Sequence, residues 1–219
     1  MADHTFRDLE TAAYCPRKLY YRRREGPSEI PEEIERRRAL ADDYERLLDD
    51  DAALLAAPIE PDPATVRERL RAARDRLDSW AGIADPADTD VYLAGKDARG
   101  IAHKLVPADE GTVPSLVFAG RPPEQGVWEP QTVRLVAAAK ALSWEREGQV
   151  ERAVAEYPAH GVVREVDVNA RRAGIYRRAL RTAESIDGPP ARVDNDAKCE
   201  PCEFREQCGV RTRSLRSLL

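Results

Sequence analysis

AKCEPCEFREQCG, residues 197–209, and AAYCPRKLYY, residues 12–21, together contain every cysteine of this chain. These are the triplet Cys199, Cys202 and Cys208, with C-x2-C-x5-C spacing, and the distant Cys15. Four thiolates are the ligand set of a [4Fe–4S] cluster or of a tetrahedral zinc ion. If one such centre binds all four, the two ends of the chain must meet, and everything between them forms a closed loop.

Composition excludes several classes of protein. The chain has 219 residues, 34% of them charged, with a net charge of -5 and a mean hydropathy of -0.60. No apolar run reaches the roughly 18 residues of a membrane span, and the N-terminal MADHTFRDLE lacks the features of a secretory signal. We therefore expect a cytoplasmic protein with no membrane partner. Thiols stay reduced in the cytoplasm, so the cysteines indicate a metal or cluster rather than disulfides.

Basic residues gather beside the cysteines although the net charge is negative. They are Arg17, Lys18, Arg22, Arg23 and Arg24 next to Cys15, and Arg211, Arg213 and Arg216 after Cys208. If the sulfurs converge, the two sets lie close together, and phosphate is the natural partner of such a surface. Tyr20 and Tyr21 are candidates for stacking on bases. The alternative is that these charges are simply solvated.

The first half of the chain reads as helical. Residues 5–23 have helical spacing, with Thr5 as N-cap and Asp8 in the first turn, and Pro16 is expected to break the helix beside Cys15. Further helices are expected over residues 32–55 and 64–80. The tryptophans, Trp80, Trp128 and Trp144, are expected to be core residues, and His160 an exposed one.

The second half alternates strands and helices. Short apolar runs at 91–94, 101–106 and 115–119 predict a β-meander, because glycine and aspartate separate them. A helix over 131–147, strands at 153–157 and 162–168, and a helix over 170–186 follow. The prediction is an α/β fold in one structural domain, with a mixed sheet flanked by helices. Its parts are an N-terminal helix (1–27), a helical insert (28–84), an α/β core (85–187) and a C-terminal cysteine segment with a basic tail (188–219).

The order of motifs in this chain resembles that of the RecB-like, CRISPR-associated exonucleases of the PD-(D/E)XK nuclease superfamily. The motifs are, in order, YCPRKLYY, the β-meander, GRPPEQGVWEP at 120–130, an amphipathic helix and CEPCEFREQC. The resemblance covers nearly the whole chain. It implies a restriction-endonuclease-like core and favours a [4Fe–4S] cluster on the four cysteines over Zn²⁺. It also implies single-stranded DNA as substrate and Mg²⁺ or Mn²⁺ as catalytic ion.

The nuclease positions implied by the resemblance depart from the family's pattern. His103 stands where the G-x-x-D strand has its aspartate, and Leu116 and Phe118 stand where the D/E-x-K strand has its acid and lysine. Arg134 replaces the glutamine of the following helix. Hard cations need oxygen ligands, so these positions are expected to be degenerate and the nuclease activity lost.

The leading hypothesis is a catalytically inactive cluster protein that binds single-stranded or end-bearing DNA, or scaffolds a DNA-processing complex through a protein partner. Its nucleic-acid contacts are expected at Arg17, Lys18, Tyr21, Arg22, Arg23, Arg211 and Arg213. One alternative is an active, metal-dependent single-stranded DNA exonuclease whose acids come from Asp97, Asp109 and Glu110. Another is a redox or iron sensor in which the cluster is the signal.

Overall fold

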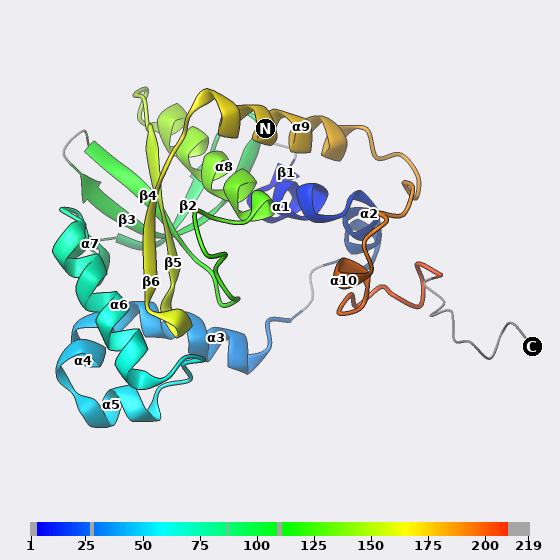
Figure 1. Cartoon of the computed structure of the whole chain (residues 1–219). Coiled ribbons are helices and arrows are strands. Elements are labelled where there is room, and N and C mark those ends of the chain that lie inside the picture. The colour runs from blue at the N-terminus through cyan, green and yellow to red at the C-terminus, as the bar shows by residue number, and fades with distance from the viewer. Residues whose placement is uncertain (1–3, 27–28, 87, 109–110, 210–219) are drawn as a thin grey trace, which may run out of the picture.

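A computed structural model describes residues 4–26, 29–86, 88–108 and 111–209. The fold is α/β, with a mixed sheet that has helices on both of its faces (Figure 1). The predicted class is confirmed at this level. None of the helices in the described ranges combines the length and apolar character needed to cross a bilayer.

The sheet has the order β1-β3-β4-β5-β6, with β2 paired to β3. Its strands are β1 (His4–Thr5), β2 (Asp88–Ala94), β3 (Ala98–Ala108), β4 (Gly111–Val117), β5 (Arg152–Tyr157) and β6 (Val162–Asp167). The β2–β3, β3–β4 and β5–β6 pairs are antiparallel, whereas β4 and β5 are parallel. A parallel pair needs a crossover connection, and helix α8 (Glu129–Glu145) lies within it.

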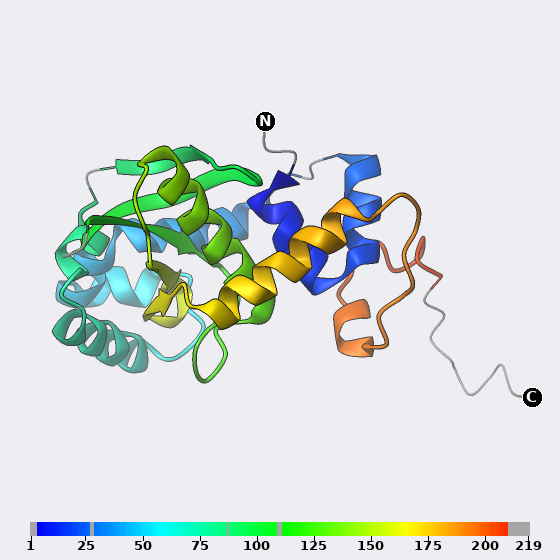
Figure 2. The same cartoon turned by 90° about the horizontal axis from the view of Figure 1, so that it is seen from above.

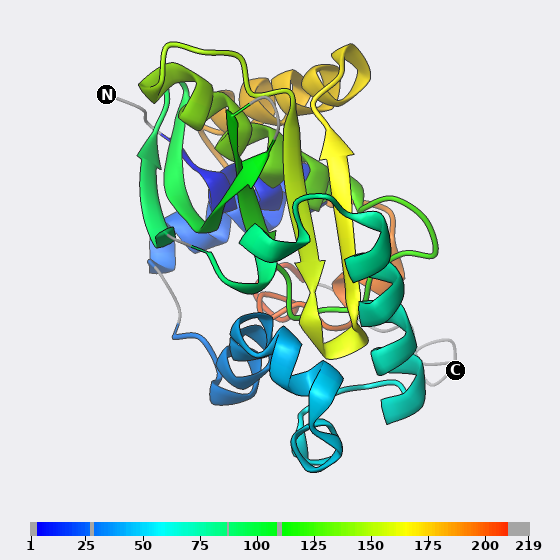
Figure 3. The same ribbon diagram turned by 90° about the vertical axis from the view of Figure 1, so that its left-hand side faces the viewer.

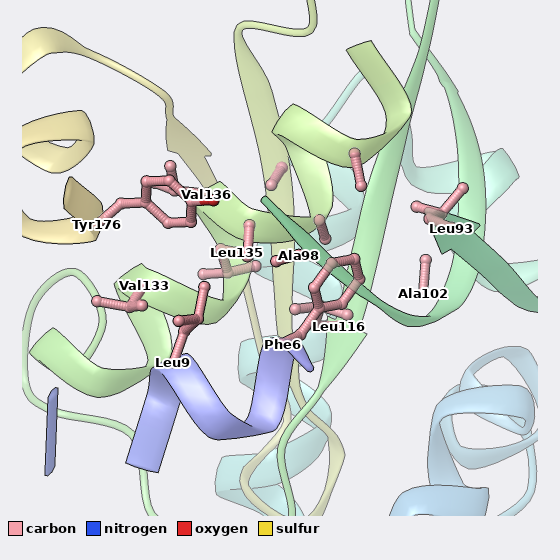
Figure 4. Close-up of a cluster of buried hydrophobic side chains, with 14 of the residues drawn as sticks. Phe6, Leu9, Leu93, Ala98, Ala102, Leu116, Val133, Leu135, Val136 and Tyr176 are labelled. Atoms are coloured by element: carbon pink, nitrogen blue, oxygen red, sulfur yellow. The ribbon is translucent and has the colours of Figure 1, made fainter. Parts of the chain in front are cut away.

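The first face of the sheet is covered by α1 (Phe6–Tyr14), α8 and α9 (Ala170–Glu184). Figure 4 shows their apolar side chains meeting those of the strands, and Figure 2 shows α9 running across α1. The contact is closest at Gly100, where a Cβ atom would lie 2.5 Å from the Phe6 ring. Only glycine lets α1 approach β3 this closely.

The insert covers the other face, as Figure 3 shows. It comprises α3 (Glu32–Ala39), the 3-10 turn η1 (Leu40–Asp42), α4 (Tyr44–Asp49), α5 (Asp51–Ala56), α6 (Pro63–Arg76) and α7 (Trp80–Ala84). The expected single helix over 32–55 is therefore broken. One break occurs at Asp50, whose extended backbone ends α4 and whose side chain accepts from the amides of Ala52 and Ala53 to begin α5.

A buried ion pair lies within the sheet, and its lysine also binds the insert. The Lys104 ammonium of β3 lies 3.0 Å from a Glu156 carboxylate oxygen of β5, and both side chains are almost fully buried. The ammonium also donates to the carbonyls of Ala41 and Ile83 at 2.6 and 2.8 Å. Glu156 accepts a further hydrogen bond from the Ser115 hydroxyl. A buried charge is tolerated only with such partners.

The tryptophan and histidine expectations were partly wrong. Trp80 is in the core, but Trp128 and Trp144 are 51% and 60% exposed. Trp128 lies at the N-cap of α8, where its indole nitrogen donates to the Arg121 carbonyl. His160, expected to be exposed, is buried in the 3-10 turn η2 (Pro158–His160).

Candidate metal centre and the adjacent basic cleft

Cys15 lies at a break between two helices. Its backbone is extended, with φ of -161° and ψ of 113°, and it separates α1 from α2 (Pro16–Glu25). Pro16 occupies the first position of α2, where its missing N–H costs nothing. The predicted break is therefore confirmed, and it removes Cys15 from the regular surface of either helix.

The C-terminal segment lies beside α2, as Figures 1 and 2 both show. Its short helix α10 (Asp196–Cys199) is capped by the Asn195 side chain. The contacts that join the two ends span more than 170 residues of sequence. They are Tyr14–Lys198, Arg17–Pro190, Lys18–Glu203, Tyr21–Gln207, Glu25–Gln207 and the stacked rings of Tyr21 and Phe204.

All four cysteines line one small cavity between α2 and this segment. Cys199 is buried, and Cys15, Cys202 and Cys208 are half-buried free thiols. Within the described residues, no three His, Cys, Asp or Glu side chains stand close enough together to hold a single metal ion. A tetrahedral zinc with Zn–S bonds of 2.3 Å would require sulfurs about 3.8 Å apart. The donor set itself, four thiols around one cavity, has the chemistry of an iron–sulfur or zinc site.

The thiols also affect the neighbouring side chains. Burial raises the pKa of the Tyr14 hydroxyl, and Cys202, Cys15 and Cys199 raise it further because thiolates disfavour a second anion. The pKa of Arg17 is raised first by its interaction with the Tyr21 hydroxyl, and additionally by the charges of Cys208 and Cys15. The contributions of Cys202 and Cys199 to Tyr14, and of Cys208 to Arg17, arise because residues from opposite ends of the chain have come together.

The predicted nucleic-acid residues on α2 have partners inside the protein. Arg17 donates to the Pro190 carbonyl at 3.3 Å, and Lys18 pairs with Glu203 at 2.7 Å. The other contacts are Tyr21 to the Gln207 carbonyl, Arg22 to the Thr11 hydroxyl, and Arg23 to the Ala183 carbonyl and His4. Arg17, Lys18 and Tyr21 therefore help to dock the cysteine segment, whereas Arg22 and Arg23 bind α1, α9 and β1. Arg211 and Arg213 lie outside the described residues.

The positions compared with the nuclease motifs divide into two groups. His103 and Arg134 line a cleft of about 1090 Å³, whereas Leu116 and Phe118 belong to the core cluster and do not line it. From β4, Val117 borders the cleft instead. Phe118 remains near, because the Arg134 guanidinium lies 5.6 Å from its ring centre.

His103 is held neutral in this cleft. Burial lowers its pKa to about 3, and the positive charges of Arg134, Arg38 and Arg7 add to the effect. Its Nδ1 accepts a hydrogen bond of 2.9 Å from the Val117 amide. The neutral ring must then carry its proton on Nε2.

Sequence reasoning missed two sets of residues. Arg7 and Arg38 come from helices α1 and α3, and no local sequence pattern indicated that they would line the same cleft as Arg134. Lys104 and Glu156 were also missed, although a lone lysine or glutamate inside an apolar strand is a signal of buried pairing. Asp97, an alternative catalytic acid, lies near the Tyr176 hydroxyl at a different hollow. Asp109 and Glu110 are outside the described residues.

The chain was also compared with known proteins. Neither the scan against protein families nor the search of curated proteins gives a match to this chain.

Proposed function

We propose that this chain is an iron–sulfur protein with a restriction-endonuclease-like core that binds single-stranded or end-bearing DNA without cutting it. The observation that carries the proposal is the gathering of all four cysteines around one cavity, next to the basic helix α2. The resemblance to RecB-like exonucleases in the order of its motifs supports the same reading.

Cys15, Cys199, Cys202 and Cys208 would hold the cluster. When bound, it supplies a covalent link between the two ends of the chain. The existing contacts prepare this link, because the Lys18–Glu203 pair and the Tyr21–Phe204 stack already hold the segment against α2. A [4Fe–4S] cluster is favoured over zinc by the spacing of the cysteines together with the nuclease-like order of elements.

Loss of hydrolysis is supported by the chemistry of the cleft. A catalytic Mg²⁺ or Mn²⁺ needs converging carboxylate oxygens, but His103 and the cationic Arg134 occupy two of the positions compared with the nuclease motifs. A buried arginine repels a divalent cation. Four acids border the cleft, namely Asp8, Glu35, Asp42 and Asp90. Asp8 already caps α1, so an exonuclease that used this cleft would draw on Glu35, Asp42 and Asp90.

DNA is supported as the ligand by the basic residues along α2. A guanidinium has five N–H donors, so Arg17 and Arg22, with one internal hydrogen bond each, and Arg23, with two, are still able to bind phosphate. Three phosphate contacts on a single strand would give a log–log dependence of affinity on salt with a slope of about -2.

The test uses anaerobically purified full-length protein and a fluorescein-labelled single-stranded oligonucleotide. We expect anisotropy to report binding that weakens between about 50 and about 200 mM salt, and that Arg17→Gln reduces. Arg178→Gln, a change at an exposed arginine paired only loosely with Glu129, serves as the matched control. Negligible binding at low salt would contradict the DNA assignment.

The same oligonucleotide incubated with Mn²⁺ should remain intact. If it is degraded, and if Asp42→Asn or Asp90→Asn abolishes the degradation, the chain is an active exonuclease. The inactive assignment would then be wrong.

A further inference from the structure

The cleft that contains His103 and Arg134 is lined more by basic than by acidic side chains. It is formed by the first turn of α1, helices α2, α3 and α8, and strands β2 and β3. Its basic residues are Arg7, Arg22, Arg23, Arg38, Lys104 and Arg134, and its acidic ones are Asp8, Glu35, Asp42 and Asp90. Asp8 is already engaged, because it caps α1 together with Thr5.

Three of these arginines come from different helices and lie near one another. The pKa of Arg134 is lowered to about 10, chiefly by burial and also by the charges of Arg7 and Arg38, against an opposing effect of Glu10. The pKa of Arg38 is likewise lowered by burial and by Arg7, against opposing effects of Glu10 and Glu35. Like charges held together in this way favour a bound anion.

The guanidinium groups of Arg134 and Arg38 are only partly paired with carboxylates and hydrogen-bond acceptors of the protein. Arg134 is 7% exposed, and its nearest carboxylate in the described residues is Glu10, with Nη1 and Oε2 separated by 3.6 Å. That is beyond hydrogen-bond distance. Among the described residues, the buried Nε atoms of Arg134 and Arg38 have no hydrogen-bond partner. The Nε of the neighbouring Arg37 also has no partner among the described residues, but both of its terminal nitrogens pair with carboxylates, those of Glu33 and Glu60.

We propose that this cleft binds a phosphomonoester, with Arg134, Arg38 and Arg7 as its ligands. A phosphomonoester carries close to two negative charges near neutral pH and presents three acceptor oxygens. The fork of a guanidinium matches such oxygens in pairs. His103 contributes a neutral Nε2–H donor on the same wall.

The group attached to the phosphate has a surface available to it. Tyr92 and Ile101 line the same cleft and are 58% and 46% exposed. An exposed aromatic ring can stack on a nucleobase. Two sources share this chemistry: the phosphorylated end of a DNA strand, in which case the inference rests on the proposed function, and a free mononucleotide.

The experiment measures the affinities of four probes for the full-length protein. Three probes are forms of the same oligonucleotide, which carries a 5′-phosphate, a 3′-phosphate or no terminal phosphate. The fourth is AMP, whose binding is measured by calorimetry. A charge-assisted contact made only by the phosphate should give about a tenfold preference for one phosphorylated end. Arg134→Gln should remove this preference, so that the phosphorylated and unphosphorylated strands bind the variant equally well.

Arg38→Gln provides a second, less buried variant in case Arg134→Gln fails to fold, and Arg178→Gln is again the control. Binding of AMP that is lost in both cleft variants, without an end preference, would assign the free mononucleotide as the source. If no oligonucleotide binds at all, the DNA assignment is wrong, and the AMP measurement alone decides the cleft. Absence of both an end preference and AMP binding would overturn the proposal.

Discussion

Tyr14 and Lys198 hold each other through two reciprocal hydrogen bonds. The Tyr14 hydroxyl donates to the Lys198 carbonyl at 3.2 Å, and the Lys198 ammonium donates to the Tyr14 carbonyl at 3.0 Å. The ammonium also lies 4.9 Å from the centre of the Tyr14 ring. One of these residues precedes Cys15 and the other precedes Cys199. The pair therefore aligns the two segments that carry Cys15 and Cys199.

Tyr14→Phe should loosen this alignment, because it removes one of the two hydrogen bonds and keeps the ring. The loss of about 1 kcal/mol would appear as several-fold faster limited proteolysis within residues 188–209. Tyr20→Phe is the control, since the Tyr20 hydroxyl contacts only the exposed Arg24 side chain among the described residues. Equal rates for the two variants would show that the Tyr14 hydroxyl does not hold the segment.

Cys199→Ser should abolish the proposed cluster, because Cys199 is the most buried of the four thiols and a neutral hydroxyl is a poor ligand for iron. We expect anaerobically purified protein to absorb on the order of 400 nm and to contain iron, and the variant to lose both. Metal analysis of the unaltered protein is the companion measurement. A colourless protein with stoichiometric zinc would contradict the cluster and favour the zinc site.

Lys104→Met should reduce the free energy of unfolding by about 3–5 kcal/mol, because it leaves the buried Glu156 carboxylate without its cation. The double variant Lys104→Met with Glu156→Gln should recover most of that loss, since no buried charge remains. Urea denaturation of the single and double variants measures both effects. A double variant as unstable as Lys104→Met would mean that packing, and not charge, limits this site.

His103 should make the protein less stable in acid. Its pKa is about 3 in the folded state, against an ordinary value of 6.5. Between these values the unfolded chain binds a proton that the folded chain does not, so stability falls as the pH falls from 6.5 towards 3. The slope contributed by one such group is about 1.4 kcal/mol per pH unit. His103→Gln should flatten the profile of urea denaturation against pH, and an unchanged profile would show that His103 does not titrate differently in the folded and unfolded chain.

Gly100→Ala should destabilise the fold by about 1–3 kcal/mol, because the added methyl group would overlap the Phe6 ring. Gly120→Ala is the matched control. Among the described residues, no heavy atom lies within 4 Å of its Cβ position, so its effect should stay within about 0.5 kcal/mol. Thermal denaturation of the two variants compares them directly. Similar midpoints would mean that α1 can move away from β3 at little cost.

The Gly100 position also illustrates what a sequence pattern conveys and what it does not. A strand was predicted over 101–106 from its apolar run, and the glycine before it was predicted to lie in the separating turn. Gly100 instead lies inside β3, and the reason for the glycine is α1, which lies almost a hundred residues earlier. The sheet, the helices of the second half and the break at Cys15 followed from local periodicity and from proline, which act over a few residues. The breaks within the insert and the exposure of Trp128 and Trp144 depend on neighbours distant in sequence, and were not predicted.

The sequence by itself determined which residues could be ligands of the candidate metal site. Four cysteines with this spacing are a set of soft ligands in any fold. Only the tertiary structure brought Cys15 beside the other three, and gave Arg17 and Lys18 of α2 partners in the cysteine segment. It also placed Arg7, Arg38 and Arg134 together in one cleft. The physical reason is that charge repulsion and burial depend on distance in space, and three arginines on separate helices have no fixed separation until the core between those helices has packed.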